Sequence, residues 1–325
     1  MKNFFVTIYE RIKSLIKQLF RLILQPVIIV SRKIFPPGFR GLSLYEVGLF
    51  FIEGMKKSSI VLRANAITYS FIIAFVPAVL FLFTLIPYIP ISNLEENIIL
   101  TLGEVIPNEA FILLKSTIED IVTKQQTGLL SISFLISLYF ASNGVIAIMN
   151  AFNQSSHSIE YRTTIKKHLI AILLVFILAI NMIISAAALA LSSVVLYFMK
   201  EKGVIGDSFT LFLIQAGQWI VILLTSLFAF SSIYYLAPAK KRIFPFFSPG
   251  SILAAILSVV SFNVFSIFIE NFSNYNRFYG SLGAMIMIIF WINLTALMLL
   301  IGFELNASIY EARMGNGNAK TNENE

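Results

Sequence analysis

The side chains that could do chemistry in this chain are few, and most of them are amides. The chain has no cysteine, which excludes disulfides, thiolate metal ligands and cysteine nucleophiles. His157 and His168 are its only histidines and have no carboxylate cluster beside them, so we interpret them as solvated interfacial residues. Metal-dependent phosphodiester cleavage needs clustered His or carboxylate ligands. We therefore expect no metal, no cofactor and no enzymatic activity.

Asparagines inside long apolar stretches are the main polar candidates. Asn143 and Asn150 lie seven residues apart, which places them on one helix face two turns from each other. Polar groups at membrane depth usually face a bundle interior or a wet cavity. We predict a polar interior lined by Asn143, Asn150, Asn181, Asn263 and Asn293. The open alternative is helix–helix hydrogen bonding, worth about 0.6 kcal/mol for each bond.

Two charges and one short segment complete the candidate site. Arg63 and Glu304 stand at the cytoplasmic edge of their stretches, and their matched depth predicts a pair that closes the inner end. An ion-coupled pump usually carries an ionisable residue at mid-membrane. No unpaired acid or lysine stands there, which favours a polar or amphipathic substrate. Segment 271–283 predicts a tight outer turn shaped by Tyr275, Tyr279, Gly280 and Gly283.

The elements that must position these residues are membrane spans. The chain is 58% hydrophobic and 13% charged, with a mean hydropathy of +0.84. That is too little charge for the surface of a soluble protein. A crossing helix needs about 20 mostly apolar residues, and six stretches qualify: 66–89, 128–152, 169–198, 209–236, 249–272 and 281–303. We predict an all-α, multi-pass membrane protein.

The distribution of positive charge predicts the orientation. If the N-terminus is cytoplasmic, only five of the 24 lysines and arginines face outside: Lys115, Lys124, Lys200, Lys202 and Arg277. Positive charge concentrates on the cytoplasmic side, so both termini should be cytoplasmic. The net charge of +7 lies in short segments beside the membrane. Its expected partner is therefore the anionic lipid of the inner leaflet, and not nucleic acid.

The remaining segments suggest three regions. Residues 1–63 form a basic region with amphipathic helices suited to the membrane interface, including 44–55. Residues 64–309 form the six-helix domain, and its acidic outer connection, 90–127, is either a lid or a solvated loop. The tail, 310–325, is polar and is expected to be disordered.

Four blocks of sequence resemble the YihY/virulence factor BrkB family, over roughly 44–309. They are RANAITYSFIIAFVPAVLFL (63–82), FASNGVIAIMNAFN (140–153), YYLAPAKKRIFPFFSPGSILAAILS (234–258) and NYNRFYGSLGAMIMIIFWINLTALMLLIGFELNA (274–307). Asn143 stands where the family pattern has an arginine. The resemblance implies a six-helix protein of the bacterial inner membrane. Its former ribonuclease BN label is regarded as a misattribution, and no biochemical activity transfers with it.

Two hypotheses of different classes follow. The first is a transporter or lipid-translocating protein with a polar-lined bundle and a lipid or amphipathic substrate. The second is a non-transporting scaffold that maintains the envelope, with solidly packed spans and mutually paired asparagines. A membrane nuclease would need a metal-ligand cluster. Small residues at Gly250, Ala254 and Ser258 could pack helices within a chain or between copies, as in a homo-oligomer.

Overall fold

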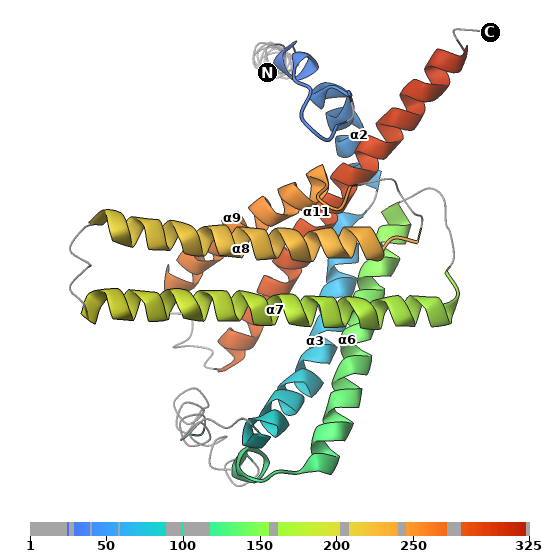
Figure 1. Ribbon diagram of the computed structural model, residues 1–325. Coiled ribbons are helices and arrows are strands. Elements are labelled where there is room, and N and C mark those ends of the chain that lie inside the picture. The colour runs from blue at the N-terminus through green and yellow to red at the C-terminus, as the bar shows by residue number, and fades with distance from the viewer. Residues whose placement is uncertain are drawn as a thin grey trace, which may run out of the picture. The chain divides into compact units, whose positions relative to one another are not determined.

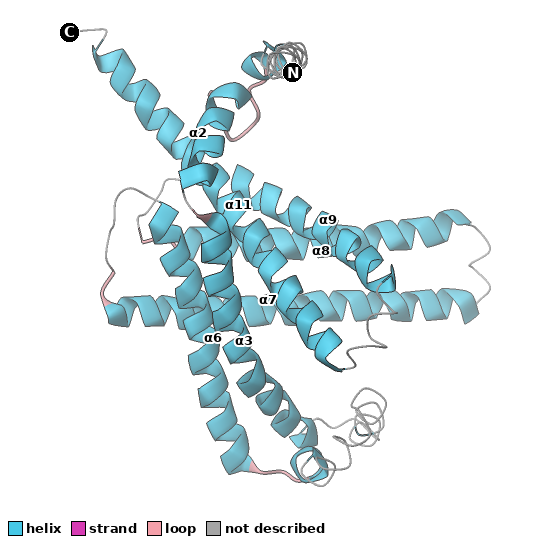
Figure 2. Ribbon diagram, turned by 180° about the vertical axis from the view of Figure 1, so that it is seen from behind, coloured by secondary structure: helices cyan, strands magenta, loops and turns pink. Residues whose placement is uncertain are grey.

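The described part of the chain is helical. The computed structural model describes residues 25, 29–39, 41–57, 59–88, 99, 118–155, 162–201, 208–239, 245–271 and 281–322, and no strand occurs among them. The helices are α2 (Leu44–Lys57), α3 (Ile60–Leu85), the 3-10 turn η1 (Ile86–Tyr88), α6 (Thr127–Ser155), α7 (Thr164–Glu201), α8 (Ser208–Leu236), α9 (Pro249–Asn271) and α11 (Ser281–Asn322) (Figures 1 and 2). The all-α prediction is confirmed.

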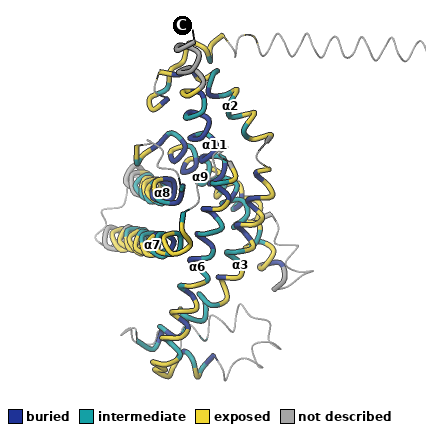
Figure 3. The backbone as a smooth tube through the Cα atoms, turned by 90° about the vertical axis from the view of Figure 1, so that its right-hand side faces the viewer, coloured by how far each residue is buried: buried dark blue, intermediate teal, exposed yellow. Residues whose placement is uncertain are grey.

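Six helical segments among the described residues are long and apolar enough to cross a membrane. They are Ile60–Tyr88, Thr127–Gln154, Thr164–Leu191, Gln215–Leu236, Pro249–Ile269 and Met285–Met314, and each overlaps one predicted stretch. Large apolar side chains such as Leu173, Ile180 and Ile184 are exposed along α7. Figure 3 shows this exposed outer face of α7 and a similar one on α8. Such surfaces suit lipid, and the chain is a multi-pass membrane protein.

The chain divides into two compact units, 1–58 with 304–325 and 59–303. In the first unit, α2 begins with a capping box, in which the Ser43 hydroxyl accepts from the Glu46 amide at 3.2 Å and the Glu46 carboxylate accepts from the Ser43 amide at 2.8 Å. Val47 of α2 then packs with Ile309 and Ala312 of α11.

This packing departs from the predicted division of the chain. The prediction ended the membrane domain at 309 and left 310–325 disordered, whereas α11 continues to Asn322. Ile309 and Ala312 are buried against α2, and their burial holds the helix beyond the predicted boundary. The amphipathic helix expected before residue 25 lies outside the described residues.

The second unit holds α3 to α9 and the first part of α11. Helices α3 and α6 run side by side, and the pair α7 and α8 crosses them steeply (Figures 1 and 3). The Ser137 hydroxyl donates to the Pro77 carbonyl at 2.6 Å, and the Thr84 and Ser133 hydroxyls lie 3.1 Å apart. These bonds tie α3 to α6. The core lies where the helices meet, with Ala64, Ala171, Leu174, Ala254 and Leu300 fully buried.

Helix α9 meets α11 at an unusually close crossing. A Cβ placed on Gly302 would stand 2.5 Å from the Gly250 carbonyl oxygen, 2.5 Å from the Tyr234 hydroxyl and 2.8 Å from the Ala254 Cβ. The Tyr234 hydroxyl donates to the Leu299 carbonyl at 2.6 Å. Glycine at 302 is thus what allows the two helices and the tyrosine to meet.

Most of the outer connection lies outside the described residues, so whether it forms a lid stays open. Its described end contributes Ile118 and Val122, which pack with Ile86. Lys124 and Asp120 form an exposed ion pair at 2.5 Å.

Candidate functional site

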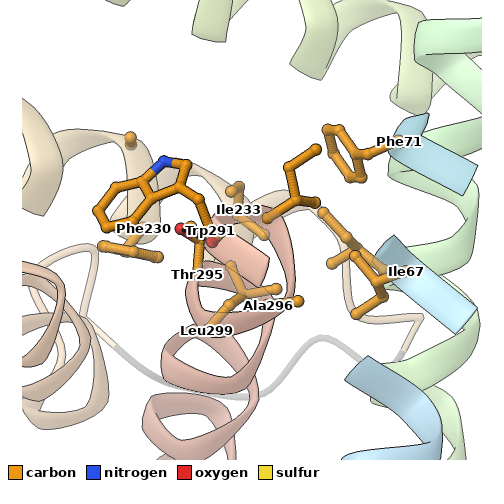
Figure 4. Close-up of a pocket in the computed structure, with 11 residues that line it drawn as sticks. Ile67, Phe71, Phe230, Ile233, Trp291, Thr295, Ala296 and Leu299 are labelled. Carbon is orange, nitrogen blue, oxygen red and sulfur yellow. Dashed lines mark hydrogen bonds between the residues drawn. The ribbon is translucent and has the colours of Figure 1, made fainter. Parts of the chain in front are cut away.

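A pocket of about 300 Å³ lies in the second unit where four spans meet (Figure 4). Figure 4 shows Trp291 and Phe230 on one side of it and Phe71 and Ile67 on the other. The lining residues are Ile67 and Phe71 of α3, Ile148 of α6, Ala229, Phe230 and Ile233 of α8, and Trp291, Ile292, Thr295, Ala296 and Leu299 of α11.

The lining is almost entirely apolar. Thr295 contributes its only hydroxyl, which already donates to the Trp291 carbonyl at 3.0 Å. The Trp291 indole N–H is the other polar atom on a lining side chain, and it makes no hydrogen bond with another described residue. None of the lining residues carries a charge. The pocket therefore suits a hydrocarbon group better than an ion or a sugar.

Neighbouring residues hold the pocket walls in place. The Trp291 ring packs against Phe265 and Phe262 of α9, with ring centroids 5.1 and 5.5 Å away. On the opposite wall, a Cβ on Gly144 would stand 3.4 Å from the Phe71 ring. The backbone of α6 at Gly144 therefore lies directly behind the Phe71 ring. The aromatic walls are thus fixed from behind by the protein.

Two of the predicted asparagines join neighbouring helices. Asn293 of α11 donates to the Asn65 side-chain oxygen at 2.8 Å and to the Thr68 hydroxyl at 3.1 Å, which links it to α3. Asn181 of α7 donates to the Thr225 carbonyl of α8 at 3.2 Å.

The other three asparagines lie in different surroundings. Asn150 is exposed and accepts a hydrogen bond from the Lys167 ammonium. Asn263 is exposed and donates to the Val259 carbonyl of its own helix at 2.8 Å. Asn143 is half-buried, and its side chain makes no hydrogen bond within the described part of the chain. The described residues that line the pocket include none of the five asparagines, so the polar lining stays a prediction.

Arg63 and Glu304 are both buried, at 2% exposure each. Arg63 belongs to the second unit and donates to the Ala151 carbonyl of α6 at 2.8 Å. Glu304 belongs to the first unit, where a Cβ on Gly54 of α2 would stand 3.4 Å from its carboxylate. The Arg63–Glu304 pair stays a prediction.

The predicted outer turn is largely beyond the described residues. Tyr275, Tyr279 and Gly280 lie outside them, and Gly283 is buried in the first turn of α11. No group of three or more His, Asp or Glu side chains that could hold a metal ion occurs among the described residues.

Two features were missed from the sequence. Arg162 donates to the carbonyl of Leu236, the last residue of α8, and to the carbonyls of Ala237 and Pro238, which follow it. Partial burial lowers its pKa, because desolvation penalises the charged form. The pocket was also missed, although Trp291, Thr295 and Leu299 recur every four residues, because that spacing is shared by any buried helix face.

Comparisons with known proteins identify the family. The chain is 29% identical over 267 residues to "Putative ribonuclease-like protein YfkH" of Bacillus subtilis, covering 80% of this chain and 92% of that protein. It is 25% identical over 278 residues to a UPF0761 membrane protein of Psychromonas ingrahamii, covering 82% and 88%. A UPF0761 membrane protein of Vibrio campbellii is 32% identical over 136 residues, 42% of each chain.

No solved structure matches the chain. The family model described as "Virulence factor BrkB" matches residues 51–325. This range covers all six membrane-spanning helices, the pocket and the Gly302 crossing. The chain therefore belongs to the virulence factor BrkB family of membrane proteins.

Proposed function

We propose that this protein transports a lipid or another amphipathic molecule across the bacterial inner membrane. The observation that carries the proposal is the apolar pocket of about 300 Å³ formed by four membrane-spanning helices. Pockets for small molecules run from about 300 to 1,000 Å³. The volume therefore suits part of an acyl chain, with the rest of the molecule outside the pocket.

The polar residues supply the second half of the proposal. A headgroup that crosses the membrane needs polar contacts along its path. Asn143 lies 16 residues into its span, or about 24 Å at 1.5 Å per residue. It is half-buried, and its amide makes no hydrogen bond with another described residue, so it can offer one to a passing headgroup. We keep the predicted lining by Asn143, Asn150, Asn181 and Asn293 as part of the proposed path. Asn263 is exposed on α9 and is not part of that path.

The first experiment tests the pocket. The purified protein is reconstituted into liposomes with a fluorescent lipid, and a quencher added outside reports whether the lipid crosses between leaflets. Ala229→Phe should fill the pocket and slow crossing at least several-fold. Leu224→Phe, on an exposed position of the same helix, is the matched control and should leave the rate unchanged. Equal rates for both variants would remove the pocket from the mechanism.

A binding measurement separates occupancy from transport. Trp219 and Trp291 are the only tryptophans, so Trp219→Phe leaves Trp291, in the pocket wall, as the single tryptophan, which can be excited selectively. Lipids with brominated acyl chains should quench it, and adding Ala229→Phe should reduce the quenching. If the two proteins are quenched equally, no acyl chain enters the pocket.

A third experiment tests the polar path. Asn143→Leu and Asn150→Leu should each slow crossing of the fluorescent lipid without changing Trp291 quenching. Unchanged crossing would support a path that avoids these two residues.

A non-transporting scaffold is the second candidate function. The observation that favours it is the contact between Asn293 and Asn65, because paired asparagines are what solid helix packing would show. The liposome assay distinguishes the two functions. No crossing by a folded protein, for any lipid tested, would favour the scaffold.

We also propose that both termini are cytoplasmic and that Arg32, Lys33 and Lys56 contact anionic lipid of the inner leaflet. Because the chain has no cysteine, single cysteines can report topology. In intact cells, a membrane-impermeant maleimide should label Gln125→Cys and spare Lys33→Cys. The opposite pattern would reverse the orientation.

We further propose that the protein is not an enzyme. The name of the Bacillus subtilis relative makes ribonuclease the activity to test. RNA incubated with the purified protein and divalent metal should remain intact. Cleavage that co-purifies with the wild-type chain would refute this part of the proposal.

A further inference from the structure

Helix α9 presents two opposite faces. Its inner face is buried in the bundle through Ser251, Ala254, Ala255 and Phe265. Its outer face is exposed and carries Ile256, Val260, Asn263 and Ile267. In a helix of 3.6 residues per turn, these four residues form one stripe directly opposite the buried face. Asn263 is the single polar residue among these four.

The position of Asn263 is energetically unfavourable for a lone chain in a bilayer. It lies 14 residues from Pro249 and six from Ile269, or about 21 Å and 9 Å from the two ends of its span. Its amide donates to the Val259 carbonyl, but its carboxamide oxygen accepts no hydrogen bond within the described part of the chain. Lipid tails offer neither donors nor acceptors, so the remaining polar atoms would face hydrocarbon.

The spacing of the stripe matches a helix–helix seam. Ile256, Val260, Asn263 and Ile267 are separated by four, three and four residues, the alternation of the a and d positions in a two-stranded coiled coil. A single asparagine at such a position fixes the register of two helices and their number. The same amide that is unfavourable in lipid is therefore well placed to pair two copies.

We propose that this stripe of α9 is a homodimer interface centred on Asn263. Two copies inserted in the same orientation are related by a two-fold axis along the membrane normal, so equivalent residues face each other at equal depth. Among the described residues, each Asn263 side chain leaves one N–H and its carboxamide oxygen without a hydrogen bond. Each therefore donates to the partner's Asn263 and accepts from it, which satisfies the groups that lipid cannot.

The other face of α9 is already used within the chain. A Cβ on Gly302 of α11 would meet the Gly250 carbonyl oxygen and the Ala254 Cβ. This small-residue face of α9 therefore packs against α11. The sequence left open whether the small residues of this helix pack within one chain or between two copies. Gly250 and Ala254 pack within the chain, and we assign the outer stripe to a second copy.

Cysteine cross-linking in native membranes tests the interface. The chain has no cysteine, so a single one can be placed on the stripe and another beside it. Val260 and Val264 are matched in type and similarly exposed, at 53% and 61%, but only Val260 lies on the stripe. Mild oxidation should give a covalent dimer with Val260→Cys and little with Val264→Cys. Equal cross-linking of both variants, or none with either, would overturn the proposal.

The role of Asn263 is tested in the Val260→Cys background. Asn263→Leu should weaken association roughly 3- to 18-fold, measured as cross-linked dimer across a series of lipid dilutions. Val264→Leu is the control and should leave the dilution curve unchanged. An unchanged curve for Asn263→Leu would overturn the role of the amide. Thermal unfolding of each variant verifies that the monomer is intact, because within the described residues the Asn263 side chain bonds its own helix alone.

Discussion

Replacing Gly302 by alanine is the sharpest test of how the bundle is packed. The added Cβ would lie 2.5 Å from the Gly250 carbonyl oxygen and from the Tyr234 hydroxyl, whereas ordinary contacts begin at 3.4 Å. The carbonyl belongs to the backbone of α9, so the helix itself would have to move.

The magnitude follows from three terms. Alanine gains about 1 kcal/mol over glycine inside a helix. Overpacking a close crossing costs about 1–3 kcal/mol. Displacing Tyr234 from the Leu299 carbonyl leaves a buried polar group without its partner, which costs about 1–3 kcal/mol. The net destabilisation is about 3 kcal/mol.

Thermal unfolding in detergent measures the effect. Gly302→Ala should lower the apparent Tm by about 5–10 °C. Gly217→Ala in α8 is the matched control, because nothing lies within 4 Å of its added Cβ, and it should be neutral or slightly stabilising. Tyr234→Phe removes one of the clashing atoms, so the alanine should cost less in that background. Equal Tm values for Gly302→Ala and Gly217→Ala would refute the packing argument.

Three further substitutions test single contacts. Arg162→Met should lower the free energy of unfolding by about 1–3 kcal/mol, because the carbonyls at and just after the end of α8 lose their cation. An effect no larger than that of exposed Lys166→Met would contradict this role. Ser43→Ala should lower the free energy of unfolding by about 1 kcal/mol and speed amide hydrogen exchange in the first turn of α2. Unchanged exchange would show that the capping box is dispensable. Asn293→Leu should destabilise the α3–α11 contact by about 0.6–1.7 kcal/mol, and a more stable variant would count against the bond to Asn65.

The sequence alone determined the class of protein. An apolar run of about 20 residues has one stable form in a bilayer, because a helix satisfies its own backbone hydrogen bonds. All six spans were therefore predictable from composition and length. The resemblance carried by blocks such as GFELNA, which contains Gly302 and Glu304, also led to the family that the comparisons show.

Only the tertiary structure decided how the spans meet. Hydropathy does not tell which face of an apolar helix is buried, since lipid and protein interior are similarly apolar. The pocket beside Trp291 and the junction of Ile309 with α2 were therefore hidden from the sequence. The same reason applies to the asparagines. Their depth in the membrane was predictable, but the contact of Asn293 with Asn65 and the outward position of Asn263 depend on how each helix is rotated, and packing sets that rotation.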